Sequence, residues 1–453
     1  MSKPNILYLH THDVGRHVQP YGHNIPTPNL MKLADEGIVF RHAFCANPTC
    51  SPSRAALLTG QWPHQNGMFG LAGRRGWNLY DQSRHMAPTL RERAGYFTAK
   101  AGVTHAGPVD YDKSIETWGA GGGVEFLVQD PPQPFFLSVG LADPHRMGRG
   151  FSPPPDYASQ TDPRFVKVPD PLPDTETTRQ DMAEFIDATQ SMDQQMGRVL
   201  EALDRSGLAD NTLVICTTDH GIAFPDMKCN LTDHGLGIML IMRGPRSTGS
   251  PRQCSGQAGQ AGGFTGGRVL DAMVSHVDIY PTICELIGMD PPEWLEGHSL
   301  LPLARGETDS VRDEIYGEIN VHAEYEPQRC VRTKRWKYIR HFDADRSLRM
   351  TNCDASVSKD LWMDGGWTRN AHERPEHRLY DLVLDPQERH NLADDPDHAD
   401  VLNDMQQRLQ TWMEKTDDPL LQGTIPVPDD ATIMVNAPDA IEPAEPLQEW
   451  DKR

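Results

Sequence analysis

The chain has 453 residues and a formal net charge of −21, and 38% of its residues are hydrophobic. This length favours a large α/β domain with a smaller companion, and the hydrophobic content suffices for a sizeable buried core. The acidic charge opposes nonspecific attraction to nucleic acid and to anionic membranes, because both are polyanions. No apolar run approaches the length of a membrane span, so neither a nucleic-acid partner nor a membrane partner is expected.

The eight cysteines are scattered singly, without the density of a disulfide scaffold. Met1 to Asn5 lead directly into a strand-like run, with no apolar signal segment between them. These features predict a cytoplasmic protein with mostly reduced cysteines. An anionic substrate would need a local cluster of cations that outweighs the acidic surface.

Strand-like runs recur along the first part of the chain, at residues 5–10, 95–101, 135–141, 212–218 and 236–243. The segments between them are long enough to contain helices, and this alternation predicts a mostly parallel sheet with helices on both faces. Apolar periodicity and glycine stops predict helices at residues 28–36, 181–204 and 278–287. Two glycine-rich stretches are predicted to be loops, at residues 119–123 and 256–267.

After about residue 325 the sequence changes to short aromatic and charged runs, at residues 335–340 and 378–382, which are typical of a small antiparallel sheet. A helix is predicted near residues 398–415, and the last thirty or so residues, rich in Pro, Asp and Glu, are predicted to be an extended tail. We therefore expect a catalytic α/β domain over residues 1–325 and a smaller C-terminal antiparallel subdomain with an acidic tail over residues 326–453.

The most informative motif is Cys50-Ser51-Pro52-Ser53-Arg54, followed closely by Leu58-Thr59-Gly60. It resembles the signature of the formylglycine-dependent sulfatases of the alkaline phosphatase superfamily, Cys-x-Pro-Ser-Arg followed by Leu-Thr-Gly. By chance, the fixed residues arise in a chain of this size on the order of one time in a thousand. The resemblance implies an α/β fold with a large mixed, mostly parallel sheet sandwiched by helices, and a smaller C-terminal antiparallel sheet with a helix.

The resemblance also implies that a formylglycine-generating enzyme oxidises Cys50 to an aldehyde. The hydrated aldehyde carries two hydroxyl groups, one of which attacks sulfur while the other later expels sulfate, so catalysis is covalent and proceeds in two steps. Arg54 is expected to brace this hydrate. A cysteine without such a motif is more often a buried packing residue, and Cys45 is interpreted in that way.

The family holds one divalent metal ion with an Asp-Asp pair after the first strand and an Asp-Asn pair after a later one. The corresponding residues here are His12-Asp13 and Asp219-His220, both at carboxyl ends of predicted parallel strands, and the side chain of residue 50 completes the expected ligand set. A lone Asp after a strand is more often a helix cap, but two such pairs beside the nucleophile motif favour ligation.

Two histidines in the expected ligand set leave the identity of the metal open. Calcium is implied by the resemblance, whereas imidazoles in place of oxygen ligands favour manganese or zinc. Asp-His-Gly at residues 219–221 also resembles the phosphonate monoester and phosphodiester hydrolases of the same superfamily, so His220 has the stronger claim to be a ligand. His12 either binds the metal directly or supports a ligand without contacting the metal. His10, on the same face of the strand, is the competing candidate for this position.

Three further residues match positions that contact the transferred group in the family. His105 matches the histidine that contacts the formylglycine hydroxyl, His145 matches the one that protonates the leaving group, and Lys228 matches a cation that binds sulfate. The family lysine before the first histidine is replaced by Val103, and Lys100 is not its equivalent.

Within the family, the chain most resembles the sulfamidase (heparan N-sulfatase) branch, through residues 64–71, 143–146 and 173–175. The expected activity is hydrolysis of a sulfate ester or sulfamate on a small anionic substrate, such as a sugar or an aryl compound. The alternative is hydrolysis of a phosphonate monoester or phosphodiester by the same nucleophile. A degenerate homologue that only binds its ligand is a third interpretation, against which the intact motif residues count.

Overall fold

The structure is a computed structural model that describes residues 3–117, 119–151, 160–245, 263–366, 372–429, 431 and 433. Its centre is a nine-stranded sheet in the order β4-β3-β5-β1-β6-β8-β2-β7, with β9 paired to β2. The strands are β1 Asn5–Thr11, β2 Ile38–Phe44, β3 Phe97–Gly102, β4 Lys113–Ile115, β5 Phe135–Gly140, β6 Thr212–Thr218, β7 Gly237–Ile238, β8 Leu240–Arg243 and β9 Arg268–Ser275.

Most neighbours in this sheet run parallel, because β1 lies between β5 and β6 and pairs with both in parallel register. Strand β8 runs antiparallel to β6 and to β2, which makes the sheet mixed. The predicted mixed, mostly parallel sheet is therefore confirmed. The run predicted as one strand at residues 236–243 consists of the two short strands β7 and β8.

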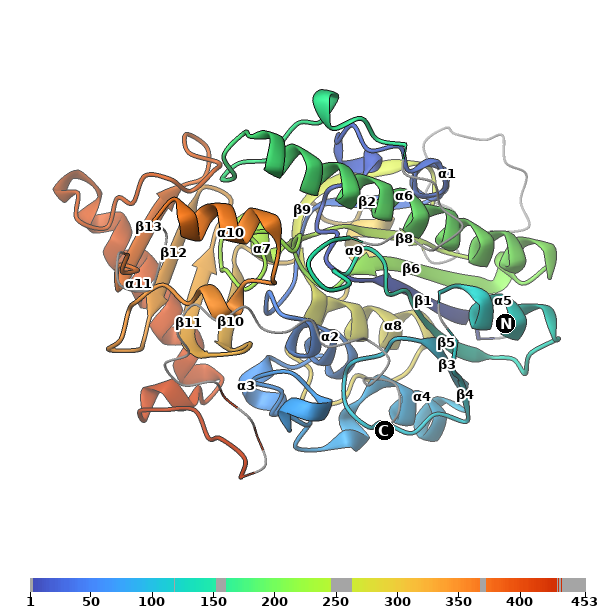
Figure 1. Ribbon diagram of the computed structural model, residues 1–453. Coiled ribbons are helices and arrows are strands. Elements are labelled where there is room, and N and C mark those ends of the chain that lie inside the picture. The colour runs from blue at the N-terminus through green and yellow to red at the C-terminus, as the bar shows by residue number, and fades with distance from the viewer. Residues whose placement is uncertain are drawn as a thin grey trace.

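Helices cover both faces of the sheet (Figure 1). In β1, Ile6 and Tyr8 enter one hydrophobic core while Leu7 and Leu9 enter the other, since successive side chains point to opposite faces. Helices α2, α4 and α8 contribute to the first core and α1, α5 and α6 to the second. The helices are α1 Pro28–Glu36, α2 Cys50–Thr59, α3 Pro63–Asn66, α4 Met86–Ala94, α5 Gly121–Val128, α6 Glu176–Arg205, α7 Asp233–Leu236, α8 Ile279–Ile287, α9 Leu301–Arg305, α10 Val357–Asp364 and α11 Ala399–Lys415.

The C-terminal part forms a second, four-stranded antiparallel sheet at the left of Figure 1. Its strands are β10 Ile315–Val321, β11 Tyr325–Arg332, β12 Trp336–His341 and β13 His377–Asp381. Helix α11 packs on this sheet through the buried side chains Met405, Leu409, Trp412 and Met413. The small sheet begins at β10, so the domain division expected between residues 325 and 326 falls inside β11.

The prediction of a loop at residues 119–123 is wrong for its second half, because α5 begins at Gly121. The helix replaces a loop because these glycines allow close packing. A Cβ atom at Gly122 would lie 2.5 Å from Thr117 Cγ2, and one at Gly123 would lie 2.8 Å from Val139 Cγ2 on β5. The second glycine-rich stretch lies outside the described residues up to residue 262, as does most of the predicted tail.

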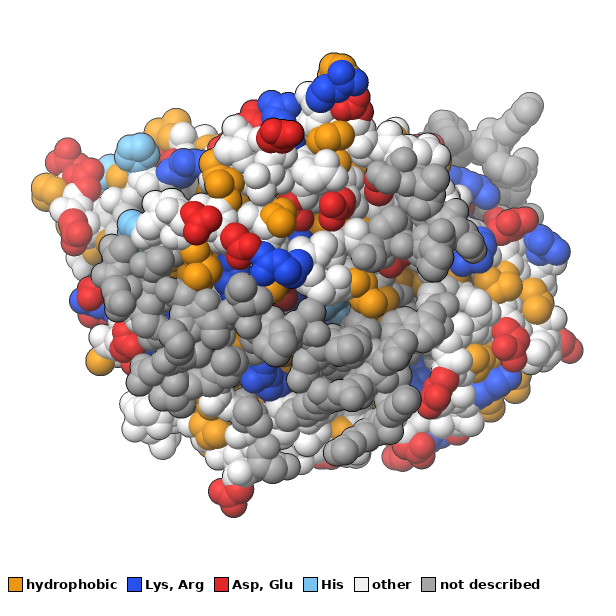
Figure 2. Space-filling model, in the orientation of Figure 1, with side chains coloured by type: hydrophobic (Ala, Val, Ile, Leu, Met, Phe, Trp, Pro, Cys, Tyr) orange, Lys and Arg blue, Asp and Glu red, His pale blue; other side chains and the backbone are white. Residues whose placement is uncertain are grey.

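None of the helices that the structure describes combines the length and the apolar character of a membrane span. On the described part of the face drawn in Figure 2, Lys and Arg side chains lie among Asp and Glu side chains.

Candidate active site

The site lies where β1 and β6 end beside the start of α2. His12 and Asp13 follow β1 directly, Asp219 and His220 follow β6, and Cys50 is the first residue of α2. The two strand ends are tied together, because the backbone N–H of Asp13 donates to Asp219 Oδ1 at 3.0 Å. All the predicted metal ligands therefore meet at one edge of the sheet, as parallel neighbours require.

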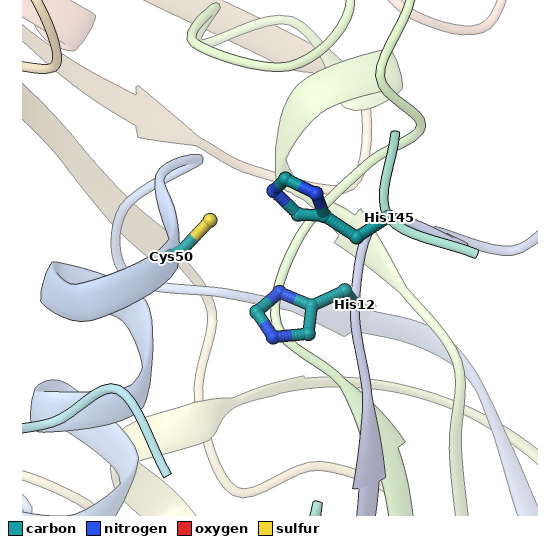
Figure 3. Close-up of side chains that lie close together, drawn as sticks. All are labelled: His12, Cys50 and His145. Atoms are coloured by element: carbon teal, nitrogen blue, oxygen red, sulfur yellow. The ribbon is translucent and has the colours of Figure 1, made fainter. Parts of the chain in front are cut away.

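Cys50 points from the start of α2 toward the rings of His12 and His145 (Figure 3). Its residue is 2% exposed, and its Sγ lies 3.4 Å from His220 Nε2. Burial raises the pKa of the Cys50 thiol well above its ordinary value. The unmodified side chain is therefore a neutral thiol and a weak nucleophile at neutral pH.

Arg54 lies one helical turn after Cys50 and is only 1% exposed. Its Nη2 donates to the carbonyl of Thr11 at 2.9 Å and to Asp219 Oδ2 at 3.1 Å, and its Nη1 donates to His10 Nδ1. Because His10 Nδ1 accepts, its Nε2 carries the proton and donates to Ser138 Oγ at 3.0 Å. His10 therefore orients Arg54, and it is not part of the groups of side chains that can hold a metal among the described residues.

Four side chains, His12, Asp13, Cys50 and Asp219, bring one donor atom each to within 4.8 Å of one another. His12 Nδ1 lies 3.1 Å from Asp219 Oδ2. Burial would raise the pKa of Asp219, but His220 and Arg54 hold it well below its usual range, and burial lowers the pKa of His12. At neutral pH the site therefore presents an anionic Asp219 and a neutral His12, which are the forms that bind metal ions.

His220 supports the same interpretation through its hydrogen bonds. Its Nδ1 lies 3.0 Å from the carbonyl of Gly221, which only accepts, so Nδ1 carries a proton and Nε2 is the ring nitrogen that faces the site. That Nε2 lies 3.3 Å from Asp13 Oδ1, which is buried and accepts no hydrogen bond. An imidazole nitrogen and a carboxylate oxygen that approach each other in this way are both ligand atoms of the kind that divalent metals bind, so the donor set fits a divalent metal.

His145 comes from the loop that follows β5 and faces the site. Its Nδ1 donates to the carbonyl of Arg146 at 2.8 Å, which leaves Nε2 facing Asp13 Oδ2 at 3.9 Å. Its side chain is 24% exposed, which makes it accessible to a leaving group. The loop is fixed to α6, because Arg146 forms a bidentate ion pair with Asp181 at 2.8 and 2.9 Å.

His105 follows β3 and faces the same cluster, with its ring 6.3 Å from that of His12. Its backbone has a positive φ of 47°, an unusual conformation for a residue other than glycine. Burial, with a further contribution from Arg54, lowers the pKa of His105 to about 3, so the ring is neutral at neutral pH. Lys100 lies apart from this cluster, since its Nζ sits over the ring of Tyr111 at 5.6 Å.

Lys228 is buried between two carboxylates. Its Nζ lies 3.2 Å from Asp13 Oδ2 and 2.9 Å from Asp354 Oδ2. Burial alone would lower the pKa of Lys228, but Asp13 and Asp354 raise it well above its ordinary value. The ammonium is therefore a fixed cation at the site.

Two residues near Lys228 were not predicted, and both come from the C-terminal part. Asp354 precedes α10, and His322 lies between β10 and β11. Burial and then Lys228 lower the pKa of His322 to about 3. Neither residue lies in a motif or at the end of a predicted parallel strand, so nothing in the sequence signalled them.

Comparison with known proteins finds relatives over most of the chain. The family model described as Sulfatase matches residues 4–122 and 120–289, and the model described as N-sulphoglucosamine sulphohydrolase, C-terminal, matches residues 261–357. N-sulphoglucosamine sulphohydrolase of Homo sapiens is 31% identical over 92% of this chain and 91% of its own length. An ulvan-active sulfatase of Formosa agariphila is 27% identical over 94% of this chain and 83% of its own length.

Solved structures share the fold. A 2-O GAG sulfatase superposes with a TM-score of 0.70 at 22% identity, covering 94% of this chain and 95% of the other. The phosphonate monoester hydrolase of Agrobacterium radiobacter superposes with a TM-score of 0.69 at 20% identity, covering 96% of this chain and all of the other. The family models and the human relative confirm the resemblance to the sulfamidase branch, and the chain belongs to the sulfatase family of sulfuric ester hydrolases.

Proposed function

We propose that this protein removes sulfate from a sulfated sugar, as an ester or a sulfamate, with formylglycine formed from Cys50 as the nucleophile. The observation that carries the proposal is the convergence of Cys50 with two buried aspartates and two buried cations, Arg54 and Lys228. The human relative, named for N-sulphoglucosamine, and a solved structure that holds D-glucosamine-2-N,6-O-disulfate favour an aminosugar substrate.

Each residue of the site has a separate role in the proposed reaction. Lys228 binds the anionic group, and Arg54 holds the hydrated aldehyde at residue 50 against Asp219. One hydroxyl group of the hydrate passes its proton to a carboxylate of the site and its oxygen attacks sulfur. The S–O or S–N bond to the sugar breaks, and His145 Nε2 gives a proton to the departing oxygen or nitrogen. His105 then takes the proton of the second hydroxyl group, so that the aldehyde re-forms and sulfate leaves.

One divalent metal ion is proposed to bind Asp13, Asp219, His220 and residue 50, with His12 beside Asp219. When bound, such an ion would neutralise charge on the transferred group. Calcium is the ion expected from the family, and the imidazoles of His12 and His220 favour manganese or zinc. Removing either carboxylate, by Asp13→Ala or Asp219→Ala, should abolish both metal binding and turnover.

A second candidate is hydrolysis of phosphonate monoesters or phosphodiesters. It is favoured by His220, whose Nε2 faces Asp13 Oδ1, and by Thr104, which lies next to Val103, where a sulfate-binding lysine of the family is missing. Parallel initial rates on glucosamine N-sulfate, an aryl sulfate and a phenyl phosphonate ester decide between the two. The comparison uses protein coexpressed with a formylglycine-generating enzyme, and Cys50→Ala is the matched control.

A sulfatase should turn over at least one of the sulfated compounds much faster than the phosphonate ester, and Cys50→Ala should abolish that turnover. The reverse order would support the phosphonate hydrolase. Metal-loaded, modified protein that turns over none of the three would revive the interpretation as a binding protein.

A further inference from the structure

Lys228 has two counter-ions, and only one of them belongs to the proposed metal site. Asp354 Oδ2 is the nearer partner of its Nζ, at 2.9 Å against 3.2 Å for Asp13 Oδ2. The Lys228 side chain is 2% exposed, so water cannot balance its charge. The ammonium therefore depends on whichever carboxylate remains available to it.

Asp13 cannot bind a metal ion and neutralise Lys228 with its full negative charge at the same time. A carboxylate bound to a divalent ion shares its negative charge with that ion, and the ion repels an ammonium a few ångströms away. With Asp13 as its sole partner, Lys228 would compete with the metal for this carboxylate. Asp354 relieves the competition, because it gives Lys228 a second carboxylate that belongs to neither of the strand ends that carry the proposed metal ligands.

The position of Asp354 is fixed by the same helix that fixes the His145 loop. Ser358, at the start of α10, donates to Asp181 Oδ2 on α6 at 2.5 Å. Asp181 also accepts both hydrogen bonds from Arg146, next to His145. The segment before α10 is further held by Lys359 Nζ, which donates to the carbonyl of Cys353 at 3.0 Å. These hydrogen bonds hold the segment that places the Asp354 carboxylate next to Lys228.

We propose that Asp354 is a positioning residue, the counter-ion that retains Lys228 at the anion-binding site when a metal ion takes Asp13. The inference rests on the proposed function for the roles of Asp13 and Lys228. The effect of Asp354 on metal affinity is therefore coupled to Lys228: Asp354 supports metal binding only when Lys228 is present. A purely structural role would not depend on whether Lys228 is charged.

The test is a thermodynamic cycle of metal affinity in the full-length protein, without substrate. Calorimetric titration with Mn²⁺, and separately with Ca²⁺, is performed on wild type, Asp354→Asn, Lys228→Met and the double variant. Asp354→Asn should weaken the affinity for the bound ion by about tenfold, because Lys228 then falls back on Asp13. Lys228→Met should strengthen it, and in that background Asp354→Asn should change it by less than about twofold.

Two further variants separate positioning from folding. Asp354→Glu should recover most of the metal affinity, because it restores the charge. Asp360→Asn is the control on the same segment as Asp354. It removes an exposed carboxylate that pairs with Arg149, and it should leave metal affinity unchanged. If Asp354→Asn does not fold, the strengthening expected for Lys228→Met still tests the competition.

The proposal is overturned if Asp354→Asn binds metal as wild type does, or weakens binding equally with and without Lys228. It is also overturned if wild type binds neither ion or if Lys228→Met weakens binding. These outcomes are independent of turnover. A wild-type protein that binds metal with the expected coupling but hydrolyses no sulfated compound would contradict the proposed function and support the role of Asp354.

Discussion

Replacement of Lys228 by methionine is expected to reduce turnover far more than the loss of an ordinary lysine would. An exposed ion pair contributes about 0–1 kcal/mol, because water screens it and side-chain entropy opposes it. Lys228 is buried, and two carboxylates hold its Nζ in place before substrate arrives. Removal of one preorganised group of this kind costs roughly a hundredfold to a thousandfold in rate. We therefore expect kcat/KM for a sulfated substrate to fall by about a hundredfold or more.

The assay compares initial rates of wild type and Lys228→Met on an aryl sulfate and on glucosamine N-sulfate, at saturating metal. Saturation separates the loss of the anion-binding charge from any change in metal affinity. Lys100→Met is the matched control, since Lys100 sits over Tyr111 and should be replaceable with little effect. Near-normal turnover by Lys228→Met would refute the reasoning, and another cation would then have to hold the anion.

Three other predictions test separate parts of the structure. His145→Ala should slow substrates with poor leaving groups much more than activated aryl esters, because His145 Nε2 supplies the proton; equal losses on both would contradict this role. Burial raises the pKa of Asp143, which accepts from Ser191 and Gln195, to about 6, whereas in the unfolded chain it titrates at about 3.9. Between these values Asp143 holds a proton in the folded protein and not in the unfolded chain, so its own contribution to stability falls as pH rises from about 4 to 6. Asp143→Asn should therefore make stability rise more, or fall less, over this range than in wild type when both are unfolded in urea; identical profiles would exclude a contribution from Asp143. Arg329→Met should destabilise the protein by about 3–5 kcal/mol, because it leaves the buried Asp418 without its partner. A loss below about 1 kcal/mol in the same unfolding experiment would show that this pair is not needed.

The parts of the fold that the sequence predicts well are those in which one apolar run equals one element. Strands β1, β5 and β6 are continuous apolar runs, and α1 and α8 end at glycines, so their limits were predicted within a residue or two. Strand β2 was missed because Arg41 and His42 interrupt its apolar pattern, and β9 because its first half alternates with exposed residues. Helix α5 was missed because glycine normally breaks helices, whereas here it permits close packing against β5.

In the site, too, local sequence patterns predict some residues and miss others. Cys50 and Arg54 lie in one motif, and His12, Asp13, Asp219 and His220 lie at strand ends that a parallel sheet must bring together, so the structure gathers them as predicted. The role of Asp354 depends on how the C-terminal sheet and α10 dock against the large domain. Such long-range packing leaves no local pattern in the sequence.

The most direct test of the account is the chemical state of residue 50 measured together with activity. The protein is produced with and without a formylglycine-generating enzyme, and each sample is digested for mass analysis of the peptide that contains Cys50. We predict that the aldehyde, which has lost the sulfur and gained an oxygen, appears on coexpression, and that sulfate release rises in proportion to the modified fraction. Full sulfatase activity in protein whose residue 50 is entirely cysteine would contradict it.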